Sequence, residues 1–294
     1  MSIFNFLKSA GASNLDNASA GETPATPNPN ANMPVTPSGV PNALASNKNS
    51  ILSGKKPLPP IKKEYDFSSE LKNLGNKPMK YDNNKTATQL IKEVSNENKI
   101  NPKLLYSSSW IEGMNKAVAS PDDVSEAYNT AVETGKLNQD EYPVDGFHNY
   151  GTDTFGDRYN ELKKYLPAGF ENRFKIFNGT NEKNQSIKTA AFKSNKDALI
   201  AKSAMLKAEQ DNVLNYAKSK GINLDPDAAD YFTMASYNGG FGGSKKMIDE
   251  YSKAKDKKSF IEKGETSQKG IHANVNKRMK IRQTADELLG MNKS

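Results

Sequence analysis

The chain has 294 residues, of which 35% are hydrophobic, and its 41 basic and 34 acidic side chains give a net charge of +7. Cysteine is absent and histidine occurs twice, which excludes disulfides, thiolate nucleophiles and metal sites built from cysteines or from three histidines. No apolar run approaches the roughly 18 residues of a membrane span. We therefore expect no membrane span, no metal and no cofactor, and chemistry that depends on carboxylates, hydroxyls, amides or lysines.

The amino-terminal residues have an unusual composition. Residues 11–64 hold most of the prolines and no aromatic residue, so they cannot bury enough apolar area to offset a chain entropy of roughly 1–2 kcal/mol per residue. We predict a disordered linker there. Residues 1–10 contain Ile3, Phe4, Phe6 and Leu7 and predict a short docking peptide for another protein, with a frayed terminus as the alternative. The first lysine follows these apolar residues, so we expect no signal peptide.

Helical patterns dominate after residue 65 and predict a mainly α fold. We expect a connecting segment at 65–85 and a helical domain at 86–294. Asn101-Pro102 and Asp225-Pro226 each combine a capping side chain with a proline in the first helical position, which is typical of helix starts. With the apolar spacing, the expected helices cover 86–98, 101–113, 195–220, 225–238, 244–254 and 274–289. No alternating pattern predicts a strand, so 120–194 is predicted to be mostly irregular connections.

Glu112 is the first candidate for chemistry. It follows Trp110 and Ile111 in the last turn of the helix that begins at Pro102, at the edge of that helix's apolar stripe. Burial and the negative end of the helix dipole both raise the pKa of a carboxyl group in such a place. A protonated glutamic acid is what general acid catalysis requires. An ordinary glutamate at a helix end is the alternative.

A glycine-rich turn forms the second candidate. Ser236, Tyr237 and Asn238 precede Gly239-Gly240 at the end of a predicted helix. Glycine lets the backbone approach a ligand closely, and the tyrosine and asparagine side chains offer directed hydrogen bonds. A phosphate-binding loop is excluded, because no Gly-Lys-Ser/Thr ending follows and no strand precedes. A simple helix cap would explain Gly239 but not the neighbouring polar side chains.

Three segments together resemble the lytic transglycosylases and goose-type lysozymes, in particular the phage-encoded members. They are Ile100–Leu105 with Trp110–Gly113, then Gly146–Gly156, then Ala235–Gly240. The resemblance covers residues 87–289 and depends on the order and spacing of short motifs. Gly113 stands where the family has a serine, and the family's glycine–leucine–methionine–glutamine turn is absent. The resemblance implies a lysozyme-like helical domain.

The resemblance also implies a reaction. Glu112 would protonate the β-1,4 glycosidic oxygen between N-acetylmuramic acid and N-acetylglucosamine in peptidoglycan, and would then act as a base. A transglycosylase closes a 1,6-anhydro ring, whereas a hydrolase needs a second carboxylate to position water.

The resemblance leaves the second carboxylate and the substrate contacts open. Candidates for the carboxylate are Asp153, Asp157 and Asp145, with a solvated loop carboxylate as the alternative for Asp153. The residues expected to bind the substrate are Tyr237, Asn238, Tyr150, Asp153 and Phe155.

The expected partners and location follow from this hypothesis. Peptidoglycan glycan strands are the expected partner, and the amino-terminal segment would bind other virion proteins. The protein would belong to a phage virion and act in the host periplasm or cell wall. The alternative is a non-catalytic virion or peptidoglycan-binding protein with the same fold.

Nucleic acid is disfavoured as a partner. The positive net charge favours anionic partners in general, although a solvated lysine-rich surface explains it as well. Basic residues cluster at 245–246, 253–258 and 277–282, but acidic residues lie among them. A nucleic-acid interface needs its basic residues on one face, and peptidoglycan is itself anionic.

Overall fold

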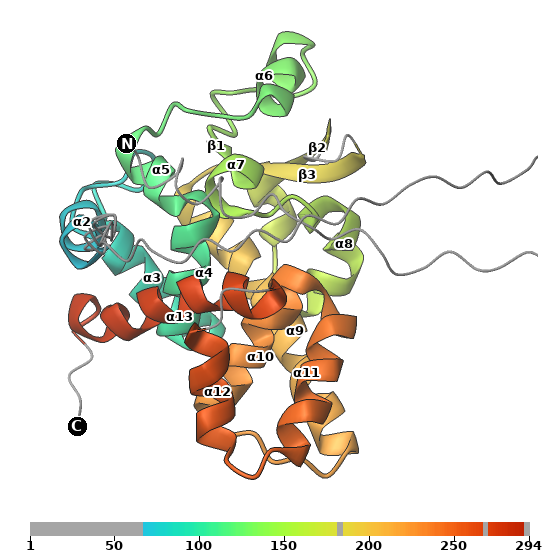
Figure 1. Cartoon of the computed structure of the whole chain (residues 1–294). Helices are drawn as coiled ribbons and strands as arrows, with labels where there is room; N and C mark the ends of the chain where they lie inside the picture. The colour runs from blue at the N-terminus through green and yellow to red at the C-terminus, as the bar shows by residue number, and fades with distance from the viewer. Residues whose placement is uncertain (1–66, 181–184, 267–269, 291–294) are drawn as a thin grey trace, which may run out of the picture. The chain divides into compact units, whose positions relative to one another are not determined.

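The computed structural model describes residues 67–180, 185–266 and 270–290 (Figure 1). The chain divides into two units, Met1–Tyr65 and Asp66–Ser294. The predicted docking peptide at 1–10 and the predicted linker at 11–64 lie outside the described residues. The described helices and strands all belong to the second unit.

The prediction of a mainly α fold is confirmed. Short 3₁₀ turns cover Lys163–Tyr165 and Phe170–Arg173, and a π turn covers Trp110–Met114. The α-helices are α2 (Phe67–Gly75), α3 (Ala87–Asn98), α4 (Pro102–Ser109), α5 (Asn115–Ala119), α6 (Glu126–Glu133), α7 (Gly146–Tyr150), α8 (Phe155–Leu162), α9 (Asn195–Ser219), α10 (Pro226–Gly239), α11 (Phe241–Lys253), α12 (Lys257–Thr266) and α13 (Gly270–Leu288).

The predicted helix starts coincide with observed caps. The side chain of Asn101 accepts a hydrogen bond from the backbone N–H of Lys103 at the start of α4. Asp225 accepts one from Ala228 at the start of α10. Each cap satisfies a backbone donor that has no partner within its helix.

The helical unit begins earlier than the predicted boundary at residue 86. Leu71 on α2 and Met79 after it are buried in the main hydrophobic core. The buried carboxylate of Asp82 accepts hydrogen bonds of 3.0 Å from the backbone N–H groups of Asn195 and Lys196, at the start of α9. The described part of the expected connecting segment is therefore an integral part of the fold.

The structure corrects the prediction of irregular connections between 120 and 194. Three antiparallel strands, β1 (Val144–Asp145), β2 (Phe174–Thr180) and β3 (Ser186–Phe192), lie in the order β1-β3-β2. Phe192 is the register partner of both Val144 and Phe174. This sheet and α6 lie at one end of the unit, and α11 and α12 lie at the other (Figure 1).

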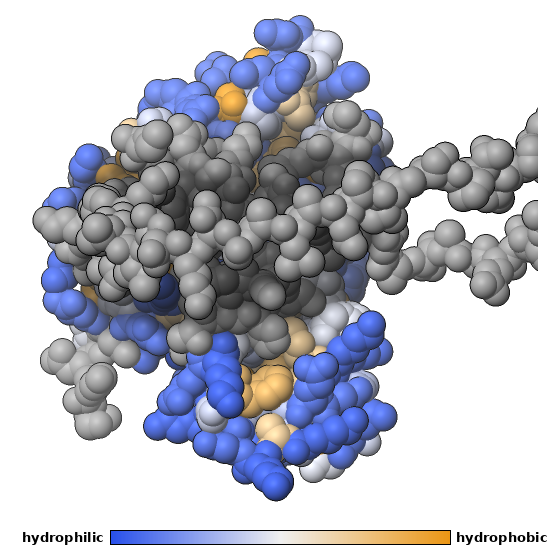
Figure 2. Space-filling view, viewed as in Figure 1, coloured by the Kyte–Doolittle hydropathy of each residue, from blue (hydrophilic) through white to orange (hydrophobic). Residues whose placement is uncertain are grey.

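The longest described helix, α9, packs against α3, α10, α11 and strand β3. Residues on most sides of α9 are buried, among them Leu199, Met205 and Val213. The face formed by α11 and α12 is mostly hydrophilic, with a small apolar cluster between the two helices (Figure 2). Among the described helices, none combines the length and apolar character that a membrane crossing requires.

Candidate functional site

Glu112 lies where a regular helix ends. The α4 helix continues into the π turn Trp110–Met114, in which Gly113 has a φ of 134°. Trp110 is buried and stacks on Tyr106, with 5.5 Å between ring centroids. The side chain of Glu112 remains 25% exposed. The apolar anchor on one side and the backbone kink on the other thus fix the direction in which Glu112 leaves the helix.

Gly113 is required by the approach of α7. A β-carbon at this position would lie 2.3 Å from the carbonyl oxygen of His148. The positive φ adds backbone strain for any side chain other than glycine. Glycine at this position therefore has a local cause, since no side chain fits between the π turn and α7.

Gly151 borders Glu112 from the other side. It ends α7 with a φ of 60°, and a β-carbon on it would lie 2.7 Å from Glu112 Oε2. The carboxyl group therefore lies directly against the backbone at the end of α7. Two of the three segments singled out in the sequence meet here.

Tyr237 brings the third segment to the same place. Its hydroxyl group donates a 2.5 Å hydrogen bond to the carbonyl oxygen of Gly151. The side chain of Asn238 is half-buried and has no hydrogen-bond partner among the described residues, so its amide is available to a ligand. Glu112, the end of α7 and Tyr237 near the end of α10 thus form one continuous set of contacts, which we call the Gly151 junction.

Lys202 also belongs to the Gly151 junction, although it was not among the site residues predicted from the sequence. It is fully buried on α9, and its amino group donates a 2.6 Å hydrogen bond to the Tyr237 hydroxyl oxygen. Burial lowers the pKa of Lys202 well below its usual value, against the opposing effect of the Asp153 charge. The sequence does contain a signal for the burial of Lys202, because this residue lies three residues from both Leu199 and Met205 on the apolar face of α9.

The three candidate carboxylates differ in role. Asp145 is fully buried and caps α7, accepting hydrogen bonds from the N–H groups of Phe147 and Ser125. Asp157 accepts one from the N–H of Lys188 at 3.0 Å. Asp153 is half-buried, and burial raises its pKa while the charge of Lys202 lowers it. Asp145 and Asp157 therefore stabilise the fold through hydrogen bonds to the backbone, whereas Asp153 lies beside the Gly151 junction.

Two expected substrate contacts need correction. Tyr150 is fully buried, and its hydroxyl group donates a 2.8 Å hydrogen bond to Asn195 Oδ1. Phe155 is also fully buried and packs edge-on against Phe174 and Phe192. Both side chains belong to the core: Tyr150 is the last residue of α7, Phe155 is the first residue of α8, and each helix end points its aromatic ring inward.

Arg278 is the second residue that sequence reasoning missed. It lies on α13, is only 4% exposed, and forms an ion pair with Glu112. Burial lowers the pKa of Arg278 to about 10, so the guanidinium group is still charged at neutral pH. In the sequence it belongs to a basic cluster that suggests a solvated face, although the buried Val275 and Ala285 place it on an apolar stripe of α13.

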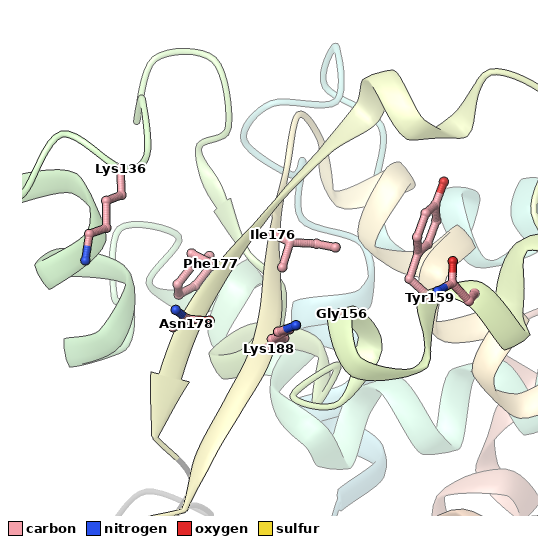
Figure 3. A pocket seen from close by; sticks show the side chains of 8 residues that line it. Lys136, Gly156, Tyr159, Ile176, Phe177, Asn178 and Lys188 are labelled. Atoms are coloured by element: carbon pink, nitrogen blue, oxygen red, sulfur yellow. The ribbon is translucent and has the colours of Figure 1, made fainter.

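A groove lies between α8 and the strands β2 and β3 (Figure 3). It has a volume of about 480 Å³. Its lining combines aromatic, amide and ammonium groups from α8, β2, β3 and the segment after α6. The residues are Lys136, Gly156, Tyr159, Asn160, Ile176, Phe177, Asn178 and Lys188. Neither Lys136 nor Lys188 makes an ion pair with another described residue, so both are available to an anionic ligand.

Chain geometry limits the distance between this groove and Glu112. Gly151 contacts Glu112, and Gly156 lines the groove. A backbone of five residues spans at most roughly 18 Å. This separation is no more than the length of a few sugar units.

No cluster of three or more His, Cys, Asp or Glu side chains suited to a metal ion occurs in the described part of the chain. No known family model, curated protein or solved structure matches this chain.

Proposed function

We propose that the protein cleaves the β-1,4 bond between N-acetylmuramic acid and N-acetylglucosamine in peptidoglycan, as a lytic transglycosylase of a phage virion. The observation that carries this proposal is the Gly151 junction. It joins Glu112, the end of α7 and Tyr237, which the sequence alone singled out at positions far apart. A functional site explains such a convergence better than three unrelated structural features do.

The chemistry requires two forms of one carboxyl group. As an acid, Glu112 donates its proton to the glycosidic oxygen, and the bond from that oxygen to the muramoyl C1 breaks. As a carboxylate, it then accepts the proton of the C6 hydroxyl group, whose oxygen bonds to C1 and closes a 1,6-anhydro ring. In the hydrolytic alternative a water replaces the C6 hydroxyl group, and Asp153 is the candidate that positions it.

The groove supports a polymeric substrate that carries both sugars and carboxylates. Its amides, Asn160 and Asn178, suit sugar hydroxyl groups, and the tyrosine ring of Tyr159 suits a sugar face. Lys136 and Lys188 suit the carboxylates of the lactyl and peptide groups of peptidoglycan. The strand would occupy the groove while a neighbouring unit reaches Glu112.

The test is a Glu112→Gln variant. We expect it to release soluble muropeptides from purified peptidoglycan roughly 100-fold more slowly than the wild type, because an amide cannot donate the proton. Glu133→Gln, at an exposed position on α6, is the matched control and should release them at the wild-type rate. Mass analysis separates anhydro ends, which indicate a transglycosylase, from reducing ends, which indicate a hydrolase. Equal rates for wild type and Glu112→Gln would remove Glu112 from the mechanism.

A second candidate function is a non-catalytic virion component that binds peptidoglycan. The observation that favours it is the ion pair of Arg278 with Glu112, which occupies the carboxyl group. In this case purified peptidoglycan would bind the protein without being cleaved. Under either function, residues 1–10 would attach the protein to other virion proteins, and residues 11–64 would let the domain reach the host cell wall.

A further inference from the structure

The ion pair between Arg278 and Glu112 conflicts with proton donation. A neighbouring guanidinium group favours the ionised form of a carboxyl group. An ionised Glu112 has no proton to give to a glycosidic oxygen. The described conformation is therefore suited to the second half of the proposed reaction and not to the first.

Burial makes this contact stronger than a surface ion pair. Arg278 is 4% and Glu112 25% exposed at their side chains. Exposed pairs contribute little because water and salt screen them, whereas water screens a largely buried pair far less. Arg278 contacts Oε1 of Glu112, and a β-carbon on Gly151 would lie 2.7 Å from the other oxygen, Oε2, so both carboxylate oxygens have close neighbours.

The α13 helix that carries Arg278 is attached to several elements. Arg282 binds Asp230 at 2.9 Å and Asp227 at 2.7 Å, both on α10. Glu287 binds Lys72 on α2 at 2.5 Å. Figure 1 shows α13 lying across α4, which it contacts together with α10. The position of Arg278 over Glu112 therefore depends on the docking of a whole helix.

We propose that α13 is an autoinhibitory element and that Arg278 is its inhibitory residue. Arg278 keeps Glu112 ionised and covered, and cleavage of peptidoglycan requires α13 to separate from the π turn. This inference rests on the proposed function, because inhibition has meaning only for an active Glu112. It makes the described conformation a resting state.

The test compares three substitutions of Arg278 in the full chain. Arg278→Met and Arg278→Gln remove the charge, with the second variant guarding against misfolding of the first. Arg278→Lys is the matched control that keeps the charge. We expect the two uncharged variants to release muropeptides about ten-fold or more faster than the wild type. Each unit by which the pKa of Glu112 rises increases the protonated fraction of this residue about ten-fold. Arg278→Lys should remain close to the wild type.

A second measurement reports on Glu112 without any cleavage. Carbon-13 NMR of glutamate side chains follows the titration of Glu112, identified as the signal absent from Glu112→Gln. We expect its midpoint to move to higher pH in Arg278→Met and Arg278→Gln but not in Arg278→Lys. Circular dichroism and the fluorescence of Trp110, the single tryptophan, establish that each variant is folded.

The outcomes separate the two proposals. If wild type and uncharged variants cleave at equal rates, the inhibitory role is wrong while the proposed function stands. If the uncharged variants are folded but slower, Arg278 assists the reaction and the inference is also wrong. If no folded variant releases muropeptides, the proposed function fails and autoinhibition fails with it, whatever the NMR titration shows.

Discussion

Gly113 carries two constraints at once. Its φ of 134° is unfavourable for other residues, and the carbonyl oxygen of His148 fills the space that a side chain would need. Because the kink at Gly113 ends the helix segment that carries Glu112, the direction of the carboxyl group depends on a residue that has no side chain.

We predict that Gly113→Ser lowers the free energy of unfolding by about 2 kcal/mol or more, through strain at the kink and the collision with α7. Urea denaturation followed by Trp110 fluorescence measures the change. Gly135→Ser is the matched control, because Gly135 also has a positive φ, of 68°, but nothing lies within 4 Å of its β-carbon position. Equal losses for the two variants would show that the contact with α7 adds nothing.

The buried Lys202 makes stability depend on pH. Its pKa is lowered in the folded state, so the unfolded chain binds more protons between that lowered pKa and the usual value of 10.5. The free energy of unfolding should therefore rise with pH in this window, by at most about 1.4 kcal/mol per pH unit from this residue.

Lys202→Met isolates this contribution. From pH 7 to pH 9 we expect the free energy of unfolding of the wild type to rise relative to that of Lys202→Met. Urea denaturation at both pH values measures this change. The lost hydrogen bond to Tyr237 contributes equally at both values and cancels. A difference that stays constant with pH would mean that Lys202 keeps its proton on folding.

Among the elements, the six predicted helices are present, whereas the strands and the shorter helices, among them α6, α7 and α8, were not predicted. The caps at Asn101 and Asp225 are local, so adjacent residues determine them. Strand β3 lacks alternation because Ala190 and Phe192 face the main core while Ala191 joins a second cluster with Tyr128 and Phe177. A strand covered on both faces shows no period of two in its sequence.

The residues of the candidate site also differ in whether local sequence predicts them. Glu112 and Tyr237 could be found because they lie in local motifs at helix ends. The roles of Lys202 and Arg278 depend on which helix packs on which, at separations of 35 and 166 residues from their partners. Their charged side chains also suggest solvent exposure when taken alone.

At the scale of the whole molecule, the fold depends on residues before α3. Leu71, Met79 and Asp82 connect this region to the core and to the start of α9. We predict that a chain of residues 66–294 unfolds at the same temperature as the full chain, and that a chain of residues 86–294 unfolds at a lower one.

Thermal unfolding monitored by circular dichroism tests both truncations. Loss of two buried apolar side chains should cost roughly 2 kcal/mol or more each, besides the hydrogen bonds of Asp82. Identical melting temperatures for the two truncated chains would mean that α2 and the following loop add no stability. A lower melting temperature for residues 66–294 than for the full chain would show that the first unit stabilises the second.

The π turn at Trp110–Met114 has a consequence for tolerance to insertions and deletions. Each residue of a helix turns the following side chains by about 100°, so one residue added or lost between Trp110 and Ala117 would rotate α5 away from its neighbours. Such length changes should abolish folding here and be accepted in the loop around Gly135. Deep mutational scanning with single-codon deletions would record that contrast directly.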